Sequence, residues 1–180
     1  MKTLFLDRDG VINKRIVDAY VTKPEEFLFL PKVKEAIKIF NSYFDYIFII
    51  TNQQGINKGL FSHKELKKVH DYMLEEIAQS GGKIDKIYYC ADLNSTNSHF
   101  RKPEAGMAEK AFLDYPDIDL NKTIMIGDFI TDLKFAKNVG IESVYLSNFE
   151  TIPKEVYLYT NQVYSNLYEY ALSLKQKNNI

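Results

Sequence analysis

Short apolar runs alternate with segments of helical period along most of the chain, and this alternation restricts the folds that it can adopt. Runs rich in β-branched and aromatic residues predict buried strands at residues 3–6, 46–50, 86–89, 123–126 and 143–146. The segments between these runs favour helices. Strands and helices in alternation predict a Rossmann-like, doubly wound α/β fold, in which a mostly parallel sheet is flanked by helices.

The two strongest helix predictions rest on apolar residues that recur every three or four positions. These residues are Val33, Ala36, Ile37 and Phe40 in the first helix, and Leu66, Val69, Met73 and Ile77 in the second. Ser62 and Glu65 stand at the spacing of a capping box, which would begin the second helix. Weaker patterns predict helices at residues 104–113 and 131–139, the latter ended by Gly140.

The length of the chain, 180 residues, is typical of a single domain. We predict that residues 1–150 form the main domain and that residues 151–180 form a C-terminal extension packed on the same domain. Within the extension the period is weak. We therefore predict that residues 155–174 form either a short surface strand or a packing helix.

Composition limits the partners and the location of the protein. The 23 Lys and Arg against 24 Asp and Glu give a formal charge of -1, which does not favour nucleic acid as a partner. The apolar runs are far shorter than the roughly 20 residues of a membrane helix, so no membrane partner is expected. Cys90 is the only cysteine and the first strand follows no signal-like segment. These features predict a cytoplasmic location, and the lack of an obvious exposed apolar helix predicts a monomer.

Two carboxylates follow the first predicted strand directly, at Asp7 and Asp9, and Gly10 then allows a sharp turn. Residues two apart in an extended segment point the same way. Both carboxylates can therefore face one pocket, where one can act as a nucleophile and the other as an acid and base. A solvated acidic turn would have the same local sequence, so the pair needs support from other motifs.

A polar cluster follows the second predicted strand at Thr51, Asn52, Gln53 and Gln54. A hydroxyl group and backbone N–H groups at the end of a strand suit a phosphate oxygen. Taken alone, a threonine at this position is more typical of a simple strand end.

Two more motifs complete the pattern. Arg101 and Lys102 precede the third predicted helix and offer cations for phosphate. Asp128 ends the fourth predicted strand, where it can bind Mg²⁺, and Asp132 can support the metal through water or stabilise the start of the next helix. All four motifs follow the carboxyl ends of predicted parallel strands or lie in the loops beyond them. We expect them to meet on one rim of the sheet.

In order and spacing, Asp7-x-Asp9-Gly10, Thr51, Lys102 and Gly127-Asp128-x-x-x-Asp132 resemble the four motifs of the haloacid dehalogenase (HAD) superfamily of phosphatases. The resemblance covers about residues 1–146. The words FLDRDGVIN, YVTKPEEFLFLP, ITNQQGINKG, IDKIYYC, RKPEAGM and MIGDFITD are similar to the heptose-bisphosphate phosphatase and histidinol-phosphatase branch. That branch has no large cap domain, and 180 residues leave little room for one here.

The resemblance implies a Mg²⁺-dependent phosphohydrolase that works through a phosphoaspartate. Asp7 would be the nucleophile, and Asp9 would protonate the leaving alcohol and then activate water. Mg²⁺ would be held by Asp7, the backbone carbonyl of Asp9 and Asp128, with Asp132 in a supporting position.

The same resemblance assigns the substrate contacts. Thr51 and Lys102 would bind the transferring phosphoryl group, while Arg101, Asn52, Gln53 and Gln54 would hold the rest of the substrate. That substrate would be a small phosphorylated sugar or amino alcohol. Within this branch the resemblance favours removal of the 7-phosphate of D-glycero-D-manno-heptose 1,7-bisphosphate, and histidinol phosphate is the alternative.

The chain departs from this branch at a zinc loop. Relatives usually carry Cys-x-His and then Cys-x-Cys just before the Arg-Lys-Pro motif, whereas this chain has Cys90, Asp92, Ser98 and Phe100 at those positions. Phe100 cannot coordinate a metal, so a closed tetrahedral zinc site is not expected. A changed loop beside Arg101 can mean a changed substrate.

Other interpretations stay open. A phospho-accepting receiver domain uses similar residues, although in another order along the chain. A non-catalytic interaction domain would explain the missing zinc ligands, and a phosphotransferase would use the same geometry as a hydrolase. His70 lies on the apolar stripe of the second helix and is predicted as a packing histidine rather than a base.

Overall fold

The computed structural model describes the backbone of residues 1–178 and the side chains as far as residue 176. The described chain forms one sheet of parallel strands in the order β3-β2-β1-β4-β5-β6. The strands are β1 (Thr3–Leu6), β2 (Tyr46–Asn52), β3 (Lys86–Cys90), β4 (Thr123–Gly127), β5 (Glu142–Leu146) and β6 (Val163–Tyr164). The predicted α/β fold is confirmed, and the strand order is that of a Rossmann-like sheet with its switch point between β1 and β4.

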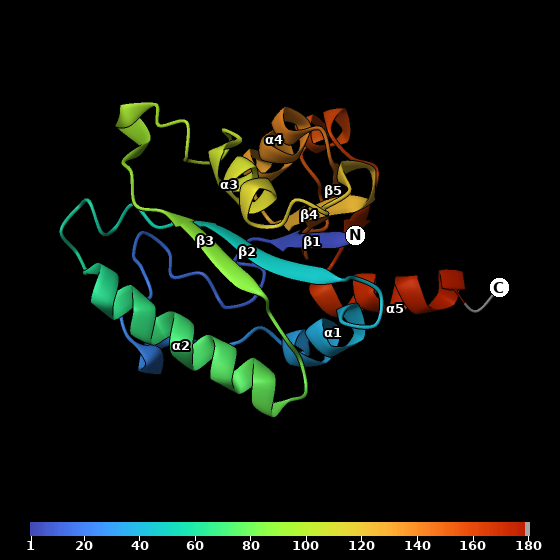
Figure 1. Ribbon diagram of the computed structural model, residues 1–180, viewed down its shortest axis with the longest axis horizontal. Helices are drawn as coiled ribbons and strands as arrows, with labels where there is room; N and C mark the ends of the chain where they lie inside the picture. The colour runs from blue at the N-terminus through green and yellow to red at the C-terminus, as the bar shows by residue number, and fades with distance from the viewer. Residues whose placement is uncertain (179–180) are drawn as a thin grey trace.

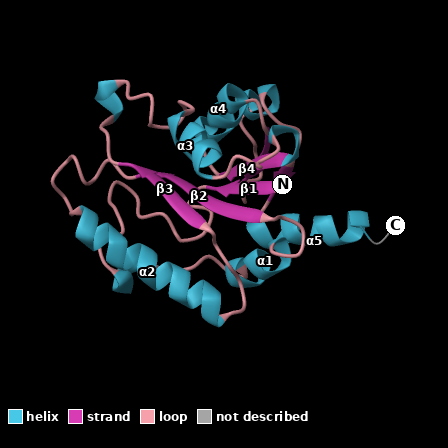
Figure 2. Cartoon of the chain, in the orientation of Figure 1, coloured by secondary structure: helices cyan, strands magenta, loops and turns pink. Residues whose placement is uncertain are grey.

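Helices cover both faces of the sheet (Figures 1 and 2). One face carries α1 (Val33–Phe40), α2 (His63–Gln79) and α5 (Leu167–Asn178), and the other carries α3 (Gly106–Asp114) and α4 (Ile130–Val139). Side chains of β1 alternate between the two layers: Leu4 and Leu6 pack with the first group of helices, and Phe5 packs with the second. This alternation follows from the two-residue period of a strand. It explains why the strands are apolar throughout.

The predicted helices occur close to the expected positions. The apolar stripes of α1 and α2 are buried as the pattern predicted, and both hydrogen bonds of the Ser62–Glu65 capping box are present. The third helix begins at Gly106 rather than at residue 104. Its first residue lies against the preceding loop, since a Cβ on Gly106 would be 2.7 Å from the carbonyl oxygen of His99. The fourth helix ends at Gly140, which has a φ of +80°.

The C-terminal segment holds three elements where the sequence predicted one. A 3₁₀ helix at Lys154–Leu158 is followed by β6 and then by α5, so the strand and the helix that were offered as alternatives both occur. β6 pairs with β5, and the Tyr170 ring lies 5.8 Å from the Phe40 ring of α1 and 5.1 Å from the Tyr164 ring. The division into residues 1–150 and 151–180 stays a prediction, and residues 179–180 lie outside the described part.

None of the helices in the described part of the chain has both the length and the apolar composition needed to cross a membrane.

The contacts of Tyr170 predict that the C-terminal segment contributes to the stability of the whole domain. Tyr170 is buried between α1 and β6. Tyr170→Ala should lower the free energy of unfolding by about 3 kcal/mol through lost burial and a residual cavity. Urea denaturation followed by circular dichroism measures this value. The exposed Tyr157 is the control, and Tyr157→Ala should change stability by less than about 0.5 kcal/mol. If Tyr170→Ala leaves the free energy of unfolding unchanged, the C-terminal segment does not stabilise the domain and the prediction is wrong.

Candidate active site

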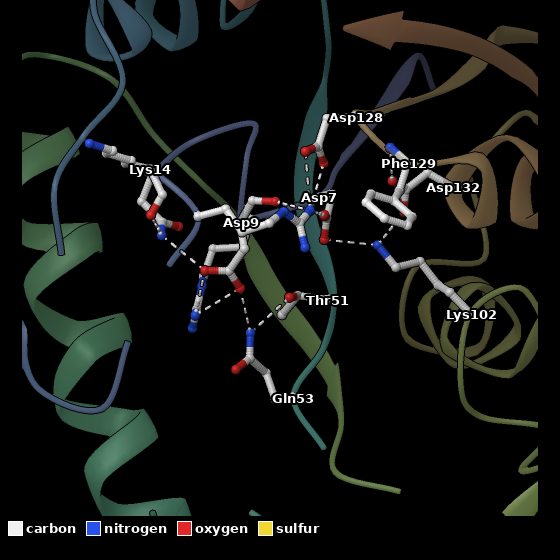
Figure 3. A network of polar contacts seen from close by, with 12 residues as sticks. Asp7, Asp9, Lys14, Thr51, Gln53, Lys102, Asp128, Phe129 and Asp132 are labelled. Carbon is white, nitrogen blue, oxygen red and sulfur yellow. Dashed lines mark hydrogen bonds and ion pairs between the residues drawn. The ribbon is translucent and has the colours of Figure 1, made fainter. Parts of the chain in front are cut away.

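The polar motifs meet at the carboxyl ends of β1, β2 and β4 (Figure 3). Leu6, the last residue of β1, is in register with Ile49 of β2 and Ile126 of β4. The backbone N–H of Asp7 continues the pairing by donating to the carbonyl of Ile126 at 3.0 Å. Three neighbouring strands therefore deliver their polar residues to one rim, as the sequence predicted from the parallel arrangement.

A buried lysine joins two of these motifs. Lys102 is 3% exposed, and its ammonium group donates to Asp7 Oδ1 at 2.8 Å and to Asp132 Oδ1 at 2.6 Å (Figure 3). Burial alone lowers the pKa of Lys102, but the carboxylates of Asp132 and Asp7 more than reverse this effect and raise it. Lys102 therefore carries a positive charge beside the carboxylate of Asp7.

Asn52 holds Lys102 in place. Its side-chain nitrogen donates to the backbone carbonyl of Lys102 at 3.0 Å, and its side-chain oxygen accepts from the backbone N–H of Lys102 at 3.1 Å. Both ends of the amide are thus engaged by the loop that carries the lysine. The predicted substrate contact of Asn52 stays a prediction, and the observed contacts are structural.

Asp9 lies in a dense set of hydrogen bonds. Gln53 donates to Asp9 Oδ2 at 3.0 Å and to Thr51 Oγ1 at 3.0 Å, so one amide links both predicted functional residues. Asn13 and Arg8 donate to Asp9 Oδ1, each at 2.9 Å. Burial opposes ionisation of Asp9, but the Arg8 charge and these hydrogen bonds prevail and lower its pKa.

Arg15 is a site residue that the sequence analysis did not identify. Its Nη2 donates to both carboxylate oxygens of Asp128, at 2.9 and 3.1 Å, and to the backbone carbonyl of Asp9. The same nitrogen lies 3.8 Å from Asp7 Oδ2. The guanidinium also stacks over the Phe129 ring, with Cζ 5.1 Å from the centroid. No local sequence pattern distinguishes an arginine in a surface loop as a site residue. Arg15 reaches the carboxylates only because its loop folds back to the rim of the sheet.

The oxygens around Arg15 Nη2 are those that the sequence predicted for Mg²⁺. Carboxylate and carbonyl oxygens are the hard ligands that this ion prefers, and oxygens of Asp7, Asp128 and Asp132 lie within 4.8 Å of one another. The backbone also makes room for Asp128, because a Cβ on Gly10, which has a φ of +95°, would lie 2.0 Å from Asp128 Oδ2. The residues therefore fit a magnesium ion.

Asp132 is almost completely buried, and both of its carboxylate oxygens accept hydrogen bonds from the protein. It accepts from Lys102, and its second oxygen accepts from the backbone N–H of Phe129 at 3.1 Å, which suits the predicted supporting position. Burial, reinforced by the charge of Asp7, raises the pKa of both Asp128 and Asp132. A bound cation would oppose this effect by favouring the ionised carboxylates.

The loop before Lys102 is held by hydrogen bonds at the positions of the missing zinc ligands. Ser98 donates to an Asp92 carboxylate oxygen at 2.5 Å, and Arg101 Nη1 donates to the Asp92 carbonyl at 3.2 Å. Gln54 accepts from the backbone N–H of Asn94 at 3.1 Å. Gln54 and Arg101, both predicted to bind substrate, thus contact this loop, and their role toward substrate stays a prediction.

Comparisons with known proteins agree with this geometry. A sequence profile of the family described as polynucleotide kinase 3 phosphatase matches residues 2–157. The D-glycero-alpha-D-manno-heptose-1,7-bisphosphate 7-phosphatase of Campylobacter jejuni is 42% identical over 83% of this chain and 84% of its own length.

Two solved structures are similar as well. The D,D-heptose 1,7-bisphosphate phosphatase of B. bronchiseptica, complexed with magnesium and phosphate, superposes with a TM-score of 0.84 at 31% identity and covers 98% of this chain and 99% of its own. A protein described as a HAD-like phosphatase from Mesorhizobium loti gives a TM-score of 0.74 at 26% identity, over 86% of this chain and 77% of its own. The chain is therefore a phosphatase that belongs to the polynucleotide kinase 3 phosphatase family, within the haloacid dehalogenase superfamily.

Proposed function

We propose that this phosphatase removes the 7-phosphate of D-glycero-D-manno-heptose 1,7-bisphosphate in a magnesium-dependent reaction that passes through a phosphoaspartate on Asp7. The observation that carries the mechanism is the buried Lys102 ammonium, 2.8 Å from the Asp7 carboxylate. A cation in this position lowers the repulsion between an anionic nucleophile and an anionic phosphate. The substrate rests on similarity to the heptose-bisphosphate phosphatases.

In the first step Asp7 attacks phosphorus and the sugar alcohol leaves. Asp9 delivers the proton to the leaving oxygen, which divides the work between two carboxylates in different surroundings. Asp7 faces Lys102, whereas Asp9 faces Arg8, Asn13 and Gln53. An arriving phosphate dianion adds negative charge near Asp9, which opposes the lowering of its pKa by Arg8 and favours the protonated form that proton delivery requires.

In the second step water cleaves the phosphoaspartate and Asp9 accepts its proton. Thr51, whose hydroxyl lies beside Gln53, contributes a hydrogen bond to the phosphoryl oxygens together with Lys102. Asp7, the Asp9 carbonyl and Asp128 would hold Mg²⁺, which would supply positive charge beside the transferring phosphoryl group. Asp132 keeps Lys102 charged and oriented through the 2.6 Å ion pair.

We propose a monomeric, cytoplasmic protein that acts on a small phosphorylated sugar, without nucleic acid or membrane partners. The formal charge of -1 supports a small substrate, since binding of a polynucleotide phosphate backbone depends on clustered basic residues.

The first test is release of phosphate by the purified protein with Mg²⁺. The panel contains both anomers of heptose 1,7-bisphosphate, histidinol phosphate, common sugar phosphates and an oligonucleotide with a 3′-phosphate. Heptose bisphosphate should give the highest kcat/KM, and Asp7→Asn should abolish turnover because the amide cannot form the phosphoaspartate. Higher activity on another member of the panel would replace the proposed substrate, and turnover by Asp7→Asn would refute the proposed nucleophile.

The position of Arg15 predicts an effect on metal affinity. Its guanidinium and Mg²⁺ require the same oxygens of Asp128 and Asp9, so Arg15→Gln should bind Mg²⁺ about tenfold more tightly, as expected from removing one charge-assisted competing contact. Isothermal titration calorimetry measures the dissociation constant. Lys14→Gln is the matched control, because the Lys14 ammonium points away from the carboxylates (Figure 3). Weaker Mg²⁺ binding by Arg15→Gln would show that Arg15 supports the metal rather than competing with it.

The hydrogen bonds of the loop at residues 91–100 predict that it works without zinc. Ser98→Ala removes the bond to Asp92 and the acceptor of the Phe100 backbone N–H. The KM for the best substrate should rise about fivefold, as expected if the two lost hydrogen bonds together weaken substrate binding by about 1 kcal/mol. The kcat should change little because Asn52 still holds Lys102.

Metal analysis of the purified enzyme supplies the complementary measurement for this loop. We expect no stoichiometric zinc by mass spectrometry and no loss of activity in 1,10-phenanthroline. One zinc per chain, together with inactivation by the chelator, would contradict the prediction.

A further inference from the structure

A buried polar chain lies behind Asp9 and leads to helix α2. Arg8 is 0% exposed, and its Nη2 lies 2.9 Å from both carboxylate oxygens of Asp9. The other end of the fork, Nη1, lies 3.2 Å from Nε2 of His70. The guanidinium thus connects a proposed catalytic carboxylate in the loop after β1 to His70 of α2, which lies 62 positions beyond Arg8 in the chain.

The chemistry of arginine settles the protonation of His70. A guanidinium has donors and no acceptor, so His70 Nε2 must accept the hydrogen bond and the ring proton must lie on Nδ1. The ring is 6% exposed and lies edge-on to Tyr89, with 6.0 Å between centroids. Burial and the neighbouring Arg8 charge lower the pKa of His70 to about 3. The imidazole is neutral at physiological pH, which excludes His70 as a cationic group toward substrate.

A fully buried guanidinium is costly unless its donors are matched. Arg8 Nε has no hydrogen-bond partner among the described residues. The contacts of Nη1 and Nη2 must therefore compensate for the burial of the guanidinium. With Nη2 alone engaged, the group could rotate about its contact with Asp9. The second contact, to His70, fixes the plane of the fork.

The anchor itself is rigid. Helix α2 is closed at its start by the Ser62–Glu65 capping box and is packed on the sheet through Val69 and Met73, which flank His70. The position of His70 is therefore set by the core and not by the active-site loop. The apolar stripe of α2 predicts only a packing role for His70, and the structure adds its polar contact with Arg8 in the loop after β1.

We propose that His70 is a positioning residue that orients the Asp9 carboxylate through Arg8 for proton transfer to the leaving group. The inference rests on the proposed role of Asp9 as the acid. Arg8 makes two contacts to Asp9 and one to His70, so a shift of Arg8 moves the carboxylate relative to the leaving oxygen. Displacement of a general acid slows reactions that need the proton and spares those that do not.

The test compares two amide variants of the same residue. In His70→Gln the side chain can place an acceptor near the position of Nε2, whereas in His70→Asn it is too short to reach Arg8. The substrates are 4-nitrophenyl phosphate, whose phenolate leaves readily without a proton, and phenyl phosphate, which depends more on the acid. The measured quantity is kcat/KM, which reports the steps up to transfer of phosphate to Asp7.

We expect His70→Asn to lose about 10- to 100-fold in kcat/KM on phenyl phosphate, within the range for a displaced acid, and less than about threefold on 4-nitrophenyl phosphate. His70→Gln should stay near wild type on both substrates. His63→Asn serves as the control, because His63 is exposed at the start of the same helix and contacts Tyr89 instead of Arg8. Equal losses on both substrates, no loss, or equal damage in the Gln and Asn variants would overturn the proposal.

A second measurement does not depend on activity or on folding of the variants. Nitrogen-15 NMR of the wild-type protein should show His70 as the Nδ1–H tautomer, and a protonated Nε2 would overturn the contact on which the proposal rests. If the wild-type protein hydrolyses neither phosphate ester nor any member of the substrate panel, the proposed function fails. The tautomer would still decide whether His70 receives the Arg8 hydrogen bond.

Discussion

The ion pairs of Lys102 are the interaction on which the site depends. One buried ammonium lies between the carboxylates of Asp7 and Asp132, and each of these charges would be costly to bury alone. Their mutual neutralisation allows the carboxylate of Asp7, the proposed nucleophile, to stand at the end of an apolar sheet. The arrangement requires three separate parts of the chain: the end of β1, the loop before α3 and the start of α4. Asn52, from the end of β2, secures the lysine backbone.

Each proposed catalytic carboxylate has its own cation. Asp7 faces Lys102, and Asp9 faces Arg8, which is itself held by His70. Separate partners allow two neighbouring aspartates to differ in ionisation and orientation, which nucleophilic attack followed by proton transfer requires. Arg15 is a third cation of another kind, because it is partly exposed and surrounded by the oxygens proposed for Mg²⁺. The site thus combines two buried cations, Lys102 and Arg8, with the partly exposed Arg15.

The loop before Lys102 is ordered by hydrogen bonds of its own side chains and backbone. Where similar phosphatases are expected to carry zinc ligands, Asp92 and Ser98 form a hydrogen bond, and the carbonyl of Asp92 accepts from Arg101. Hydrogen bonds of this kind are weaker than a structural metal site. Lys102 is secured separately from these loop contacts, by the side chain of Asn52.

The amino-acid sequence by itself determined the α/β class, the strand ends and the motif positions. Burial periods and strand-end polar residues are local signals, so the rim of Asp7, Asp9, Thr51, Lys102 and Asp128 could be predicted without coordinates. Only the tertiary structure decided which side chains meet. The contacts of Arg15 with Asp128 and of His70 with Arg8, the engagement of Asn52 by Lys102, and the pairing of β6 with β5 join distant segments. Such contacts depend on loop paths and on competition among hydrogen-bond partners, which no local pattern records.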